Sequence, residues 1–162
     1  MVQMTMDFQI RAARPGDESA LFSLILALAR FEQLEHTVTG SAEQLGLHLF
    51  GERPLAEALI AESASGDALG FALFFGTYST FLTRAGLYLE DLFVVPEARR
   101  HGIGTALLRA VGRLAREREL GRLEWAVLDW NADAIAFYEK LGASVLPDWR
   151  ICRVSGRALE SL

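Results

Sequence analysis

The sequence has few of the residues that build disulfides and metal sites. Its single cysteine, Cys152, excludes a disulfide within the chain, as is usual for proteins of a reducing compartment. The first ten residues do not place a basic segment before an apolar run, so we expect a cytoplasmic protein without a secretory signal. A metal site is not expected, because no metal-ligand spacing relates the histidines, which are His36, His48 and His101.

The chain also lacks an excess of positive charge and long apolar runs. It has 16 Lys and Arg against 21 Asp and Glu, a net charge of −5, so we expect no nucleic-acid partner. Although 51% of the residues are hydrophobic, no uninterrupted apolar stretch could span a bilayer, and no membrane partner is expected. At 162 residues the chain is predicted to form one domain, residues 1–162, whose mild acidity suits a cationic partner.

The most informative stretch covers residues 87–105. Leu87–Val95 is rich in β-branched and aromatic residues and is predicted to be a strand. Pro96 cannot donate to a β-ladder, so the strand ends there. From Thr105 onward, leucine and valine recur at helical spacing, which predicts a helix packed on a sheet.

Two glycines, Gly102 and Gly104, stand where that helix begins. A side chain at either position would hold a ligand away from the main chain, whereas without one several N–H groups can converge on an anion. Arg99 and Arg100 add full positive charges beside the turn, and a phosphate or pyrophosphate is the expected guest. Taken alone, the pattern also fits a tight turn with two solvated arginines. It matches neither the dinucleotide-binding nor the P-loop fingerprint.

The other elements follow from apolar periodicity and turn residues. Asn131, Ala134 and Tyr138 share one stripe of a predicted helix. Cys152, in the last predicted strand, is expected to be a small buried residue. The predicted strands cover 8–12, 55–62, 68–78 and 123–128, and a β-hairpin of 144–146 and 149–154 closes the sheet. A first helix is predicted to end near residue 31, and two further helices are predicted at 41–50 and 132–141.

Three short motifs stand in a fixed order along the chain: RRHGIG at 99–104, N-x-x-A at 131–134 and FYEKLG at 137–142. They resemble the pyrophosphate motif and the second cofactor motif of the GNAT superfamily of acetyl-CoA-dependent N-acetyltransferases. The resemblance implies an α/β fold, the GNAT acyl-CoA N-acyltransferase fold, with a mixed twisted sheet flanked by helices and splayed after the central strand. It also implies acetyl-CoA as cosubstrate, bound by Leu92, Phe93, Val94, Arg99, Arg100, His101, Gly102, Ile103, Gly104, Thr105, Asn131, Ala134, Phe137, Tyr138 and Lys140.

Further stretches are similar to the spermidine/spermine branch of this superfamily, which includes the thialysine acetyltransferases. They are ARFE at 29–32, LYLEDLFV at 87–94 and AVLDWN at 126–131. That branch commonly forms homodimers, so a homodimer is expected. Two features depart from it: the acidic, glycine-bearing segment before the last tryptophan is shortened to LPDW at 146–149, and Phe31 stands where a tyrosine is usual.

The chemistry of acetyl transfer predicts roles for individual residues. An alkylammonium group is almost wholly protonated at neutral pH, so a base must remove a proton, and Glu90 on the central strand is the candidate. Glu90 could equally serve only to attract the cation, and the two roles are compatible. Tyr138 is the expected general acid from its motif position, its alternative being an aromatic that caps helix packing. A main-chain N–H, that of Val94, is expected to stabilise the developing oxyanion.

The substrate pocket is expected to join acids that receive ammonium groups with aromatic walls. The leading hypothesis is acetyl transfer to a primary amine of a small diamine, a polyamine or a lysine-like amino acid. The alternatives are a GNAT enzyme acting on a protein N-terminus, a lysine side chain or an antibiotic amine, and a non-catalytic CoA-binding module. The candidate substrate-binding residues are Phe31, Glu32, Glu90, Asp91, Trp125, Asp148 and Trp149.

Overall fold

The computed structural model describes residues 6–162 and contains two compact units, divided after Trp125. The first unit carries a sheet and its covering helices, and the second carries a helix and the C-terminal segment. The prediction of one domain stays a prediction. In the first unit the elements are β1 (Phe8–Ala12), α1 (Glu18–Phe31), the 3-10 helix η1 (Glu35–Thr37), α2 (Ala42–Phe50), β2 (Glu57–Ser63), β3 (Ala68–Ser79), β4 (Arg84–Val94), the 3-10 helix η2 (Pro96–Ala98), α3 (Ile103–Glu117) and β5 (Leu123–Glu124). The second unit contains α4 (Ala132–Lys140) and α5 (Arg157–Glu160).

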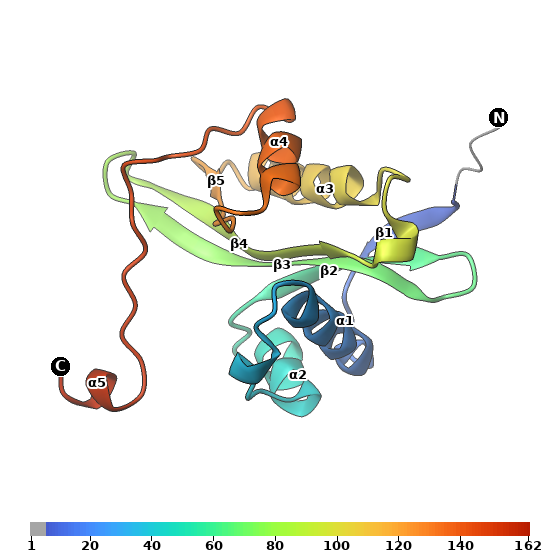
Figure 1. The fold of residues 1–162 in the computed structure, drawn as a ribbon, viewed down its shortest axis with the longest axis horizontal. Helices are drawn as coiled ribbons and strands as arrows, with labels where there is room; N and C mark the ends of the chain where they lie inside the picture. The colour runs from blue at the N-terminus through green and yellow to red at the C-terminus, as the bar shows by residue number, and fades with distance from the viewer. Residues whose placement is uncertain (1–5) are drawn as a thin grey trace. The chain divides into compact units, whose positions relative to one another are not determined.

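The five strands form a mixed sheet in the order β1-β2-β3-β4-β5. Neighbours are antiparallel except for β4 and β5, which run parallel. Helices α1 and α2 cover one face and α3 covers the other (Figure 1). This mixed α/β sheet flanked by helices confirms the predicted fold class. Buried side chains fill the interfaces between the sheet and the helices on both faces. Between the sheet and helices α1 and α2 they include Leu21, Leu24, Ile60, Phe71 and Phe93, and on α3 they include Ile103, Leu107 and Val111.

The central strand β4 is interrupted by a β-bulge at Glu90. On β3, Leu73 pairs with Asp91 and Phe74 pairs with Leu89, so Glu90 is an extra residue without an opposite partner. A one-residue insertion reverses the alternation of the strand from that point on. The bulge therefore decides which main-chain groups of the C-terminal half of β4 face away from β3.

The direction of these groups follows from two hydrogen bonds. Before the bulge, the Leu87 N–H donates to the Arg122 carbonyl on the β5 side, at 3.0 Å, and after it the Val95 N–H donates to the Leu69 carbonyl on the β3 side, at 2.9 Å. Because N–H groups alternate along a strand, the N–H of Val94 faces the β5 side. Strand β5 pairs with β4 only at Leu87 and Tyr88. Within the described residues, this edge of β4 is therefore open beyond Tyr88.

Most of the predicted elements are confirmed, including the helix capped by Ser41, whose hydroxyl accepts from the Gln44 N–H at 3.2 Å. The predicted strand 123–128 is shortened to two residues, and the predicted hairpin of 144–146 and 149–154 is wrong, because the described chain has no strand there. Apolar alternation predicts a strand only where a neighbour supplies ladder partners, and none pairs with this segment in the described structure. Cys152, predicted to be buried in that hairpin, is exposed.

Candidate active site

The turn between β4 and α3 has an unusual backbone. Arg100 has a φ of +66° and Gly102 has a φ of +83°, both in the left-handed region. Only glycine enters this region without strain, so Arg100 is held there by its surroundings. Nδ1 of His101 lies 2.8 Å from the Arg99 carbonyl oxygen, which can only accept, so Nδ1 carries the proton in this bond.

Gly102 is the N-cap of α3, and it has no side chain that could accept from the first turn of the helix. The first helical bond runs from the Ala106 N–H to the Gly102 carbonyl, at 2.9 Å. The N–H groups of Ile103, Gly104 and Thr105 therefore precede the helical ladder at the positive end of the dipole. A Cβ on Gly102 would meet no atom within 4 Å, so the space beside these groups is open. The turn fits a phosphate or diphosphate group of a ligand.

Two glycine substitutions at α3 should have opposite effects on stability. Gly102→Ala places a side chain in the left-handed region and should lower the free energy of unfolding by about 1–2 kcal/mol. Gly112→Ala lies inside the same helix with no atom within 4 Å of the new Cβ, and should raise it by about 0.5–1 kcal/mol. Urea denaturation of both variants measures the two changes. Equal effects would contradict the assigned backbone at Gly102.

The two arginines of the turn behave differently. Arg100 is exposed, and its charge is available to a ligand at the turn. The guanidinium of Arg99 instead lies over the Phe31 ring, 4.7 Å from its centroid, and 5.6 Å from the centroid of Phe93. Its Nε–H donates to the Val94 carbonyl at 3.0 Å. The expectation that Arg99 supplies charge to a bound anion stays a prediction.

Three of the four predicted substrate acids interact electrostatically: Glu90 and Asp91 lie on β4, Glu32 follows α1, and the charges of Glu90 and Glu32 both act on Asp91. Burial first, and then the charges of Glu90 and Glu32, raise the pKa of Asp91 to about 7. Glu32 is the C-cap of α1, and burial raises the pKa of its carboxyl as well. A cation placed among these groups would relieve their mutual repulsion. This part of the site is therefore suited to an ammonium group.

Tyr88 also lies in this region, although its sequence context does not predict a role in the site. Its ring stacks on Phe75 with the centroids 5.4 Å apart. Burial first, and then the charges of Glu90 and Glu124, raise the pKa of its hydroxyl. The two-residue spacing from Glu90 along the predicted strand was the available signal, since alternate residues of a strand share a face.

The remaining predicted residues of the first unit are placed as follows. The side chains of Phe93 and Ile103 are buried, so these two residues could meet a ligand only through the main chain. Leu92, Val94 and Thr105 are half-buried, as is Trp125 at the end of the unit. Phe31 is 40% exposed although Arg99 covers one face of its ring.

The second unit carries the residues of the second motif. Asn131 caps α4, its Oδ1 accepting from the Ala134 N–H at 3.2 Å. Tyr138 is half-buried, and its ring lies 5.2 Å from that of Phe137. Lys140 is the exposed last residue of α4, and beyond it Asp148 and Trp149 are exposed, Trp149 to 77%.

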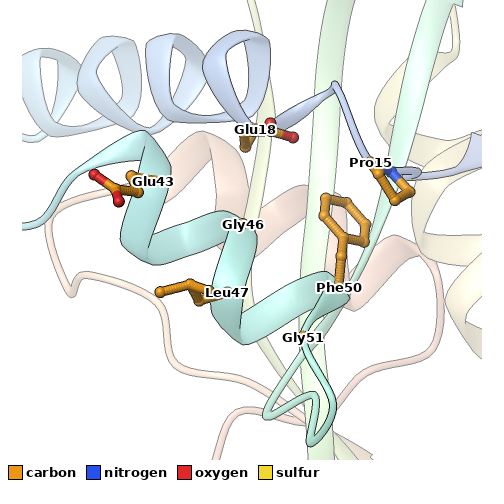
Figure 2. A pocket seen from close by; sticks show the side chains of 7 residues that line it. All are labelled: Pro15, Glu18, Glu43, Gly46, Leu47, Phe50 and Gly51. Atoms are coloured by element: carbon orange, nitrogen blue, oxygen red, sulfur yellow. The ribbon is translucent and has the colours of Figure 1, made fainter.

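A separate hollow of about 280 Å³ lies between the start of α1 and the length of α2 (Figure 2). None of the predicted site residues lines it. Glu18, on its wall, is the first residue of α1, and Phe31 is the last, which places them roughly 20 Å apart. The hollow is therefore not part of the carboxylate site. Its lining consists of Pro15, Glu18, Glu43, Gly46, Leu47, Phe50 and Gly51.

Residues 6–162 contain neither a cluster of metal-binding side chains nor a membrane-spanning helix. No group of three or more His, Cys, Asp and Glu side chains in this part of the chain could hold a metal ion. None of its helices combines the length and the apolar character needed to cross a membrane.

The free N–H groups at the start of α3 suit an anionic ligand, and the carboxyls of Glu32, Glu90 and Asp91 suit a cationic one, so the site fits an enzyme that joins an anionic cosubstrate to an amine. The chain belongs to the acetyltransferase (GNAT) family, which it matches over residues 25–143. Members of this family take the acetyl group from acetyl-CoA, and the chain is an N-acetyltransferase.

Individual relatives extend over nearly the whole chain. A thialysine N-epsilon-acetyltransferase from Bos taurus is 38% identical, over 94% of this chain and 95% of the relative. An L-ornithine N5-acetyltransferase from Arabidopsis thaliana is 32% identical, over 95% of this chain and 87% of the relative. Among solved structures, an integron cassette protein from the mobile metagenome of V. cholerae superposes with a TM-score of 0.79 at 25% identity, covering 96% of this chain and 97% of that one.

Proposed function

We propose that the enzyme transfers the acetyl group of acetyl-CoA to a primary amine of a small diamine, a polyamine or a lysine-like amino acid. The observation that carries this proposal is the group of carboxyls formed by Glu32, Glu90 and Asp91. A substrate with a second ammonium or an equivalent cation would use one charge to bind and one nitrogen to react. The thialysine and ornithine specificities of the relatives support this substrate class.

Individual residues of this chain have separate roles in binding and catalysis. The N–H groups at the start of α3 and the charge of Arg100 hold the diphosphate of acetyl-CoA, which supplies the activated acetyl group. The Val94 N–H faces the open edge of β4 and donates to the acyl oxygen. Glu90, on the bulge, takes the proton from the substrate ammonium, directly or through a water. Tyr138 provides the proton for the departing thiolate.

We also propose that the enzyme works in the cytoplasm as a homodimer. The resemblance to the spermidine/spermine branch supports the dimer, as do the exposed apolar side chains of the second unit, among them Leu146, Trp149 and Ile151. Sedimentation equilibrium measures this directly, and a monomer at micromolar concentration would contradict the dimer.

A comparison of acceptors tests the proposed substrate class. Acetyl-CoA is mixed with thialysine, L-ornithine, L-lysine, putrescine and spermidine, and with peptides carrying a free N-terminus or an internal lysine, and free CoA is measured. We expect turnover with at least one small amine and a much smaller kcat/KM with every peptide. Turnover of peptides alone would reject the substrate class. No turnover with any acceptor, together with CoA binding in calorimetry, would favour the non-catalytic module instead.

A further inference from the structure

The guanidinium of Arg99 joins the end of β4 to the end of α1. On one side its Nε–H binds the Val94 carbonyl at 3.0 Å. On the other it lies 4.7 Å above the Phe31 ring, with the buried Phe93 ring at 5.6 Å. A planar guanidinium can stack on rings while its edge donates a hydrogen bond, which an ammonium cannot do as well. Arg99 would give up these contacts if its side chain turned to an anion at α3.

Each of these contacts leads to a group with a proposed role. The carbonyl and the N–H of one strand residue point to the same side, so the bond to the Val94 carbonyl also orients the Val94 N–H. Phe31 directly precedes Glu32, whose charge acts on Asp91. Fixing the Phe31 ring therefore restrains the main chain from which the Glu32 carboxyl extends.

We propose that Arg99 is a positioning residue that sets Glu32 through Phe31 and sets the open edge of β4 through Val94, and that its side chain is not the anion ligand of the turn. This inference rests on the proposed function, because it takes Glu32 to be part of the site that binds the amine. The same turn thus serves both substrates: its main chain and Arg100 serve the diphosphate, and the Arg99 side chain serves the acceptor.

The matched variants are Arg99→Met and Arg100→Met, which remove the same charge from neighbouring positions. Arg99→Met should raise the KM for the best small amine by about tenfold, which corresponds to about 1.4 kcal/mol of lost positioning. It should leave the Kd for CoA within about twofold of the original value in calorimetry. Arg100→Met should do the reverse, weakening CoA binding with little change in the KM of the amine.

Arg99→Lys separates stacking from charge. A lysine can replace an arginine as a point charge on a phosphate but not as a stacked, planar donor. We expect Arg99→Lys to bind CoA with the Kd of the original enzyme. Its KM for the amine should still be raised, by most of the increase expected for Arg99→Met. An amine KM restored by lysine, or a CoA Kd weakened by Arg99→Met as much as by Arg100→Met, would overturn the inference.

A measurement without substrates keeps the inference independent of the enzymatic assay. In NMR spectra of the free protein, Arg99→Met should shift the amide resonances of Glu32 and Val94, Phe31→Leu should shift that of Val94, and Arg100→Met should shift neither. The effects of Arg99→Met and Phe31→Leu on amine KM should not add in the double variant, because both break one contact. If Arg99→Met does not fold, Phe31→Leu alone must still shift the amide resonance of Val94, which is linked to Phe31 through Arg99, and an unshifted Val94 would refute the proposal. A failure to acetylate any amine would refute only the proposed function.

Discussion

Tyr138→Phe should lower kcat by about 100-fold or more at neutral pH, while the Kd for CoA stays close to that of the original enzyme. The change removes only the hydroxyl, which we propose as the proton source for the departing thiolate. The ring is retained, so its contact with Phe137, 5.2 Å between centroids, should persist. Release of free CoA in the presence of the best small amine measures kcat, and calorimetry measures CoA binding.

The control for this variant is the stability of α4. Tyr138→Phe should keep the melting temperature within a few degrees, since no buried volume is lost, whereas Asn131→Ala removes the cap that binds the Ala134 N–H and should cost about 1 kcal/mol. Loss of kcat with unchanged stability supports proton transfer. A variant with its full rate would show that Tyr138 is not the acid, although the enzyme would still belong to its family.

The local parts of the site were predictable from sequence, because short stretches of chain determine them. Pro96 follows the end of β4, and Gly102 adopts the left-handed conformation at the N-cap of α3. Ser41 and Asn131 cap the helices that they precede. In each case the residue type acts on its own backbone or on the next turn, so no distant contact is needed for the prediction.

The parts that depend on distant contacts were not predictable. The bulge at Glu90 exists only in the pairing of β4 with β3, which are joined by a turn but whose register is set by the packing of both faces. The stacking of Arg99 on Phe31 joins residues 68 positions apart along the chain. The predicted hairpin of 144–154 failed for the same reason, because its apolar alternation carries no information about a pairing strand.

The buried carboxyl of Asp91 should make the protein less stable as the pH rises. In the unfolded chain its pKa is near 3.8, and in the folded protein it is raised to about 7. Between these values the folded state holds a proton that the unfolded state has lost, so stability is full below pH 4 and falls until about pH 7. The loss approaches about 4 kcal/mol. Asp91→Asn should abolish it, making the variant the more stable protein at pH 8 but not at pH 4, as measured by urea denaturation.

The same carboxyl should link amine binding to proton release. An ammonium group beside Glu90 and Asp91 favours the ionised carboxyl, so binding at pH 6 should release a proton from Asp91, and the affinity for the amine should rise from pH 6 to pH 8. Calorimetry in buffers of different ionisation enthalpy measures the proton, and Asp91→Asn should release less of it and bind the amine more weakly. Amine binding independent of pH in the original enzyme would contradict this role. The acids that lower the free energy of unfolding of the free enzyme are then the groups that a bound cationic substrate stabilises. Binding of the amine should therefore raise the free energy of unfolding most at a pH where Asp91 is ionised in the complex.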